Sequence, residues 1–239
     1  VVNIINAALH CKEYCSAVFL DVSQAFDKVW HKGLLYKIKI NLPYSTYSLL
    51  QSYLCERKFY VDISGTQSEL REVNAGVPQG SVLGPMLFLL YTADFPQFTN
   101  TNLALFADDT CIITRNQNPV TVSTQLQSHL DIIEKWFTLW RFTINNSKSV
   151  HITFTLRKDT CPPVAIYNEQ IPSQDHVRYL GMYLDKKLNW KIHIQKKREH
   201  LEHLRRSMYW LLSSRSKLSM YNKILLCKVI LKPGWVYGI

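Results

Sequence analysis

The spacing of apolar residues near the start of the chain changes from that of a helix to that of a buried strand. Val2, Ile5 and Leu9 recur at helical spacing, and the apolar run at 17–20 then predicts a short strand that ends at Asp21. An acidic side chain is therefore expected where a buried strand ends. Two further segments, 32–40 and 44–55, are predicted to be helices.

The middle of the chain alternates between strand-like runs and turn residues. Strands are predicted at 58–63 and 70–76, around the turn Ser64-Gly65, and on both sides of residues 107–110. A helix is predicted from Met86 to about Phe95. The sequence Ala-Asp-Asp-Thr at 107–110 joins two apolar runs, at 103–106 and 111–113, so it predicts a tight hairpin with two acids at its tip.

A long amphipathic helix follows. Its apolar face consists of Leu126, Leu130, Ile133, Phe137 and Trp140. Short strands are predicted at 150–155 and 176–184, and then a basic helix whose apolar side chains face inward while Arg205 and Arg206 point to solvent. This order, with the helices on one side of a small antiparallel sheet, predicts an α+β fold of ferredoxin-like type.

Composition narrows the class of protein. A chain of 239 residues with 47% apolar residues can bury a substantial core, and it contains neither a long repeat nor an apolar run able to span a bilayer. Its six cysteines are far apart and follow no zinc-binding or secretory spacing, so we expect reduced thiols in an intracellular protein. Because the chain begins with Val1 and ends without a breaker, we expect a fragment of a longer protein.

The positive charge lies at one end of the chain. Residues 1–185 hold 15 Lys or Arg and 16 Asp or Glu, whereas residues 186–239 hold 13 Lys or Arg against only Glu199 and Glu202. A basic block beside a nearly neutral body is typical of proteins that bind a polyanion. A solvated helix face or a helix lying on a membrane surface would give the same count, so charge alone leaves the partner open.

Three carboxylates are the strongest candidates for chemistry. Asp21 follows the first strand, and Asp108 and Asp109 lie in the predicted hairpin turn. Taken singly, each is ordinary loop or turn chemistry. If neighbouring strands bring them together, they repel one another unless a cation neutralises them, and Mg²⁺ is the natural cation for oxygen ligands without nearby His or Cys. Two such ions support an in-line phosphoryl transfer.

Five segments in order resemble the successive motifs of reverse transcriptases. They are Phe19-Leu-Asp-Val-Ser-Gln-Ala-Phe-Asp-Lys-Val-Trp-His31, Gly76-Val-Pro-Gln-Gly-Ser-Val-Leu-Gly-Pro85, Phe106-Ala-Asp-Asp109, Ile144-Asn-Asn-Ser-Lys148 and Tyr179-Leu-Gly-Met-Tyr-Leu-Asp185. The amino acids in these motifs are similar to those of the jockey-like group of non-LTR retrotransposons. The resemblance implies a right-hand polymerase: a palm with the end of the fingers over residues 1–185, and a basic helical partial thumb over 186–239.

The resemblance also implies roles for single residues around the metal ions. Asp21 and Asp108 would bind two Mg²⁺ ions, for which Mn²⁺ could substitute, with the carbonyl of Val22 as a backbone ligand and Asp109 completing the acidic set. Lys148 matches the lysine that approaches the leaving pyrophosphate. A surface lysine with no such role would look the same in sequence.

The remaining implied contacts are to the nucleotide and the nucleic acid. Phe26 matches the aromatic residue beneath the incoming sugar, where it would exclude a 2′-hydroxyl. The alternative is that Phe26 is only a core residue. Gln79 and Gly80 match the loop that touches the nucleotide. The positions that match contacts to primer, template or duplex are Pro78, Tyr179, Leu180, Gly181, Lys196, Lys197, Arg198, Arg205 and Arg206.

The implied function is that of an RNA-directed DNA polymerase that adds deoxynucleotides to a primer 3′-hydroxyl. Its expected partners are an RNA template, a DNA primer, deoxynucleoside triphosphates and the fingers and endonuclease regions of the same polyprotein, with no membrane partner and an intracellular location as an element ribonucleoprotein in cytoplasm and nucleus. Two alternatives stay open: a catalytically silent remnant that still binds nucleic acid, and a two-metal nuclease.

Overall fold

The chain forms two compact units. The computed structural model describes residues 1–237, and its units span Val1–Gln174 and Asp175–Ile239. The hairpin at 176–185, which the motif resemblance grouped with the palm, falls in the second unit because it packs on the helix that follows it. The boundary between the two compact units thus lies before Asp175, and the palm–thumb boundary at Lys186 stays a prediction.

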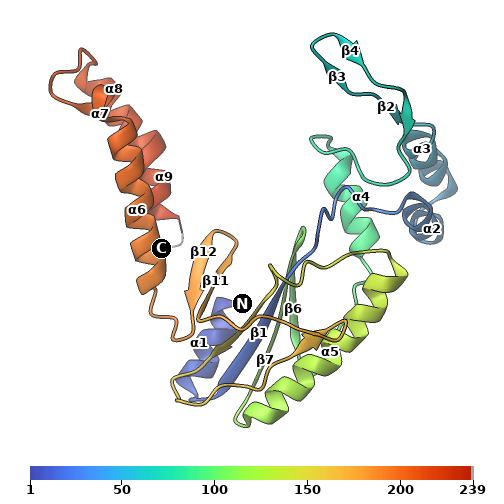
Figure 1. The fold of residues 1–239 in the computed structure, drawn as a ribbon, viewed down its shortest axis with the longest axis horizontal. Coiled ribbons are helices and arrows are strands. Elements are labelled where there is room, and N and C mark those ends of the chain that lie inside the picture. The colour runs from blue at the N-terminus through green and yellow to red at the C-terminus, as the bar shows by residue number, and fades with distance from the viewer. Residues whose placement is uncertain (238–239) are drawn as a thin grey trace. The chain divides into compact units, whose positions relative to one another are not determined.

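The first unit contains a four-stranded antiparallel sheet with the strand order β6-β7-β1-β8 (Figure 1). The central strand β1 pairs with β7 on one side and with β8 on the other. Its elements in chain order are α1 (Val2–His10), β1 (Tyr14–Asp21), α2 (His31–Asn41), α3 (Tyr44–Leu54), β2 (Lys58–Phe59), β3 (Asp62–Ile63), β4 (Thr66–Gln67), β5 (Arg71–Glu72), α4 (Leu83–Thr92), β6 (Asn102–Phe106), β7 (Asp109–Asn116), α5 (Pro119–Leu139), β8 (Val150–Phe154), β9 (Ala165–Ile166) and β10 (Glu169–Gln170).

One face of the sheet packs against α5 and α4. Val18 and Leu20 of β1 and Ile112 of β7 share a buried core with the predicted apolar face of α5, which is confirmed. Side chains of this size each contribute about 1.5–3 kcal/mol when fully buried, so this interface fixes the sheet on its helix. The short helix α1 is an exception to the expected one-sided arrangement, because it contacts β1 from the other side (Figure 1).

A buried lysine ties α2 to this core. The ammonium group of Lys37 forms an ion pair with Asp94, donates a hydrogen bond to the carbonyl oxygen of Tyr91, and lies 3.5 Å from the ring centroid of Trp140. Burial lowers the pKa of Lys37, and the contact with Asp94 opposes this shift. Carboxylate, carbonyl and aromatic face together stabilise a cation that burial alone would penalise.

The segment between α3 and α4 forms an exposed arm. The predicted strands here are confirmed only as short pieces, in which β2 pairs with β5 and β3 pairs with β4 around Ser64-Gly65. Every residue of these four strands is exposed. Without a face to bury, the segment does not extend into the main sheet.

The second unit consists of a hairpin and a set of helices. Its elements are β11 (His176–Tyr179), β12 (Met182–Asp185), α6 (Lys191–Ser207), α7 (Tyr209–Leu212), α8 (Met220–Leu226), the π-helical segment η1 (Cys227–Leu231) and α9 (Lys232–Val236). The hairpin packs on α6, and α6 packs on α9. As predicted, Arg205 and Arg206 are exposed, and Met208 is buried at the end of α6.

Across residues 1–237, none of the helices combines the length and the apolar character needed to cross a lipid bilayer.

The six cysteines carry free thiols, as expected, and three of them are buried.

Acid is expected to destabilise the first unit through His151. This residue is buried on β8, where its Nε2 lies 2.6 Å from the hydroxyl oxygen of Ser16, and burial lowers its pKa to about 4. Between about pH 6.5 and pH 4, His151 therefore binds a proton in the unfolded chain but stays neutral in the folded chain. The free energy of unfolding should fall by about 1.4 kcal/mol per pH unit from this residue as the pH drops from about 6.5 to about 4.

Urea unfolding of His151→Gln at several pH values measures this contribution. The variant should show a flatter pH dependence in that window, while the exposed His10→Gln keeps the parental slope. Some slope should remain, because burial also lowers the pKa of His129. Equal slopes for His151→Gln and the parent chain would contradict the assignment.

Candidate nucleotidyl-transfer site

The register of β1 and β7 brings two of the predicted acids together. Asp21, the last residue of β1, is paired directly with Asp109, the first residue of β7. Directly opposed residues of antiparallel strands share a face and have Cβ atoms about 5 Å apart. Phe106 pairs with Asp109 as well, so Ala107 and Asp108 alone form the predicted tight turn. All three carboxylates therefore lie at one end of the sheet.

The carboxylates act on one another electrostatically. Asp109 is exposed at the start of β7, yet its pKa is raised by partial desolvation, then by the charge of Asp108 and then by that of Asp21. The turn adds backbone strain, because Ala107 has a φ of 52°, a left-handed conformation that costs residues other than glycine about 1–2 kcal/mol. The protein thus holds three carboxylates close together at a cost in stability.

This end of the sheet suits a divalent cation that takes only some of its ligands from the protein. Within residues 1–237, no three His, Cys, Asp or Glu side chains form a ready-made metal site. The ligand set implied by the resemblance needs only two carboxylates, Asp21 and Asp108, and the carbonyl of Val22. Mg²⁺ commonly keeps waters or substrate phosphates as its other ligands. After desolvation, the charges of Asp108 and Asp21 also raise the pKa of Asp109, and a bound cation would relieve that repulsion.

A turn after α5 fixes the backbone of Asp21. The amide of Asn145 donates to the carbonyl oxygen of Asp21 at 2.9 Å, and the amide of Asp21 donates to the hydroxyl of Ser149 at 3.2 Å. That hydroxyl in turn donates to the carbonyl of Asn145. Lys148 lies in this turn with an exposed side chain. Asn145 and Ser149 were not among the predicted site residues, although Asn145 lies within the Ile144–Lys148 motif and Ser149 directly follows it.

The loop that carries Phe26 is joined to the Pro-Gln-Gly loop. The amide of Val77 donates to the carbonyl of Phe26 at 2.9 Å, and the side-chain amide of Gln79 donates to the carboxylate of Asp27 at 2.9 Å. Phe26 is half-buried and stacks on Phe88 of α4, with ring centroids 4.5 Å apart. Both readings of Phe26 are therefore compatible with its position, since the ring packs on the core and is also partly accessible.

The backbone of the Pro-Gln-Gly loop lies very close to the start of α4. A Cβ atom on Gly84 would lie 2.4 Å from the carbonyl oxygen of Pro78, so only glycine allows this contact. Gly80 has a φ of 81° and stands in open space, with no atom within 4 Å of the position of a Cβ. Gln79 and Gly80 are exposed beside Asp27, which sequence analysis did not single out.

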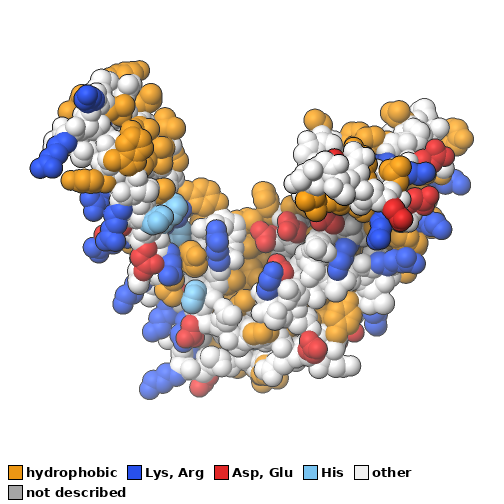
Figure 2. Space-filling view, turned by 45° about the horizontal axis from the view of Figure 1, so that its top comes forward, with side chains coloured by type: hydrophobic (Ala, Val, Ile, Leu, Met, Phe, Trp, Pro, Cys, Tyr) orange, Lys and Arg blue, Asp and Glu red, His pale blue; other side chains and the backbone are white. Residues whose placement is uncertain are grey.

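Apart from Pro78, the residues predicted to contact nucleic acid lie in the second unit. Tyr179 is buried at the end of β11, and Leu180 and Gly181 form the two-residue tip of the hairpin. On α6, Lys196 pairs with Glu199, whereas Arg198 and Arg206 both pair with Glu202. Exposed pairs of this kind are worth less than about 1 kcal/mol and exchange readily for another anion. Figure 2 shows Lys and Arg side chains along the helical unit.

Comparison with known proteins agrees with the motif resemblance. Residues 3–184 match the family described as reverse transcriptase (RNA-dependent DNA polymerase). The chain is 43% identical, over its whole length, to a probable RNA-directed DNA polymerase from transposon X-element of Drosophila melanogaster. It is 38% and 40% identical, again over its whole length, to RNA-directed DNA polymerases from mobile element jockey of Drosophila melanogaster and Drosophila funebris. It spans 27% of the length of each of these relatives.

Solved structures show the same fold. Telomerase from Candida tropicalis in complex with a fragment of telomeric RNA aligns with a TM-score of 0.55, at 13% identity, over 97% of this chain and 41% of that protein. Telomerase from Candida albicans, also in complex with such a fragment, aligns with a TM-score of 0.54 at 13% identity, over 98% of this chain and 45% of that protein. The predicted α+β polymerase fold is confirmed by this likeness.

Neutralising Asp109 should stabilise the fold. Because the folded protein raises the pKa of this carboxyl, the charged form costs stability that the unfolded chain does not lose. Asp109→Asn should therefore have a higher free energy of unfolding than the parent chain at pH 7, and the gain should shrink as the pH falls toward 4. Urea unfolding at both pH values measures it, with Asp159→Asn, an exposed acid elsewhere in the first unit, as the control. A variant less stable than the parent at pH 7 would show that Asp109 is not under electrostatic strain.

Proposed function

The chain belongs to the reverse transcriptase family, and on that premise we propose that it supplies the palm and part of the thumb of an RNA-directed DNA polymerase from a mobile element. The observation that carries this proposal is the β1–β7 register, which sets Asp21 opposite Asp109 and beside the turn at Asp108. Two motif stretches that lie far apart in the sequence, Phe19–His31 and Phe106–Asp109, thus supply the clustered oxygen ligands that the chemistry needs.

The acidic residues would organise the reacting oxygens. Two Mg²⁺ ions held by Asp21, Asp108 and the Val22 carbonyl, or Mn²⁺ in their place, would lower the pKa of the primer 3′-hydroxyl and neutralise charge on the triphosphate. The backbone hydrogen bonds from Asn145 and to Ser149 keep Asp21 from moving when its environment changes. Lys148, on the same turn, is the proposed donor of a proton to the leaving pyrophosphate.

The joined loops would receive the nucleotide. The ring of Phe26 is the proposed contact for the sugar of the incoming nucleotide, and its stacking on Phe88 keeps the ring in place. Gln79, Gly80 and Pro78 are the proposed contacts to nucleotide and template, and the open space at Gly80 leaves room for close approach. Because Gln79 already donates to Asp27, nucleotide binding would have to replace or share that hydrogen bond.

The proposed partners are an RNA template, a DNA primer and deoxynucleoside triphosphates. The basic side chains of α6 and the hairpin tip of the second unit are the proposed contacts to the duplex. The relatives are about four times as long as this chain, so we assign the fingers and the endonuclease to the rest of the same polyprotein. We propose no membrane partner, and a location in cytoplasm and nucleus as a ribonucleoprotein.

Removing one acidic ligand should abolish synthesis. In the polymerase that contains this chain, Asp108→Asn should reduce Mg²⁺-dependent extension of a DNA primer on an RNA template by at least about 10²-fold, because charge that develops on the reacting oxygens loses its stabilisation. Asp159→Asn should extend as the parent does. Salt-dependent duplex binding without extension by the parent would indicate the silent remnant, and cleavage of unprimed RNA without nucleotides would indicate a nuclease.

The sugar preference should depend on Phe26. Phe26→Val should narrow the ratio of deoxynucleotide to ribonucleotide incorporation by about 10- to 100-fold, the discrimination that one steric contact supplies. Phe88→Leu removes the same ring stacking without changing residue 26, so it controls for loss of packing. An unchanged ratio in Phe26→Val, measured by single-nucleotide primer extension, would leave Phe26 as a core residue only.

A further inference from the structure

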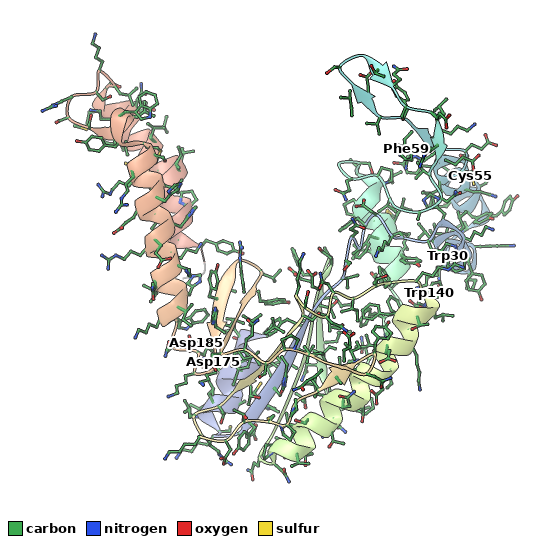
Figure 3. The ribbon with its side chains drawn as sticks, in the orientation of Figure 1. Trp30, Cys55, Phe59, Trp140, Asp175 and Asp185 are labelled. Atoms are coloured by element: carbon green, nitrogen blue, oxygen red, sulfur yellow. The ribbon has the colours of Figure 1, made fainter. Side chains whose placement is uncertain are left out.

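The β11–β12 hairpin is fixed at its base to the start of α6. Asp185, the last residue of β12, is buried, and its carboxylate accepts hydrogen bonds from the amides of Lys187, Asn189 and Trp190 at 3.1–3.2 Å. These three amides belong to the connecting residues that precede α6, so the carboxylate fixes the path of the chain from the hairpin into the helix. Figure 3 shows Asp185 at the end of the hairpin where the chain turns into α6.

A second contact joins the middle of the hairpin to the same helix. His193 of α6 is buried, and its Nδ1 accepts a hydrogen bond from the amide of Tyr183 at 3.2 Å. This role requires the unprotonated Nδ1. Burial and the nearby charge of Lys197 both lower the pKa of His193, which favours that neutral form.

The tip of the hairpin contains backbone strain. Its two central residues, Leu180 and Gly181, both have positive φ, of 45° and 78°. Two-residue hairpin loops with positive φ at both positions favour Asn-Gly, because asparagine and glycine tolerate this conformation. Leucine does not tolerate it well, so the tip needs support from outside the turn.

Tyr237, beyond the end of α9, supplies that support. Its hydroxyl donates a hydrogen bond to the carbonyl oxygen of Leu180 at 2.5 Å, and its ring lies against Gly181, where a Cβ atom would be 3.0 Å from Cε1. Lys197 of α6 holds the ring from another side, with its ammonium 4.9 Å from the ring centroid. The strained tip, the basic helix and residue 237 thus meet in one set of contacts.

We propose that Tyr237 is a positioning residue that holds the Leu180–Gly181 tip in the conformation that receives the primer strand. This inference rests on the proposed polymerase function, in which the tip contacts the primer. The contacts of Tyr237 described above are to this tip and to Lys197. Loss of Tyr237 should therefore weaken the use of primer–template and leave nucleotide binding intact.

The test uses Tyr237→Phe in the polymerase that contains this chain. This variant keeps the ring against Gly181 and beneath Lys197 and removes only the hydrogen bond to Leu180. The KM for primer–template should rise by about 3- to 10-fold, the effect of one hydrogen bond, with the KM for deoxynucleotide unchanged. Tyr221→Phe, which removes the hydroxyl of an exposed tyrosine in the same unit, should have parental values.

A second variant separates positioning from general stability. Leu180→Asn converts the tip to Asn-Gly, which adopts positive φ without outside support. In this background, Tyr237→Phe should change the KM for primer–template by less than about 2-fold. An equal loss in both backgrounds, or a loss that extends to the KM for deoxynucleotide, would overturn the proposal.

Amide hydrogen exchange of the 239-residue chain makes the outcome independent of polymerase activity. The amides of the Tyr179–Met182 pair at the end of the hairpin should exchange about 3- to 10-fold faster in Tyr237→Phe, and those of β1 and β7 should not change. Unchanged exchange at the tip would refute the support by Tyr237. Faster exchange in a protein that extends no primer would uphold that support and place the failure in the proposed polymerase function.

Discussion

The antiparallel register of β1 and β7 sets Asp21 opposite Asp109, with Asp108 in the turn that precedes β7. Like charges directly opposite each other on a sheet destabilise it. The pKa of Asp109 is raised first by desolvation and then by the charges of Asp108 and Asp21, so repulsion adds to the cost of this end of the sheet. A shift of one residue would move Asp21 to the other face of the sheet. The site therefore exists only in this register, and the rest of the first unit has to maintain it.

Several independent contacts maintain the register. On one face, Val18 and Leu20 of β1 are buried against α5 and the neighbouring strands. At the end of β1, Asn145 and Ser149 bind the backbone of Asp21. The loop that follows is held in turn by the amide of Val77. Apolar burial thus supplies the free energy that the acidic end costs, while backbone hydrogen bonds fix where the acids stand.

Features that depend on local pattern could be predicted from the sequence. The strand that ends at Asp21, the tight turn at Asp108 and the apolar face of α5 follow from alternation, turn residues and helical spacing. The contacts of Lys37, the bond between Gln79 and Asp27 and the support by Tyr237 join residues 52 or more positions apart. No periodicity encodes such contacts, because they depend on how whole elements pack. For the same reason the hairpin's place in the second unit emerged only from its contacts with α6.

Anomalous diffraction from crystals of this chain grown with Mn²⁺ tests the central claim most directly, because it locates the cation without reference to turnover. The account predicts anomalous density within coordination distance of the carboxylates of Asp21 and Asp108, about 2.0–2.2 Å, and its loss in Asp21→Asn. Crystals that show anomalous density at other acidic residues but none at this end of the sheet would contradict the account.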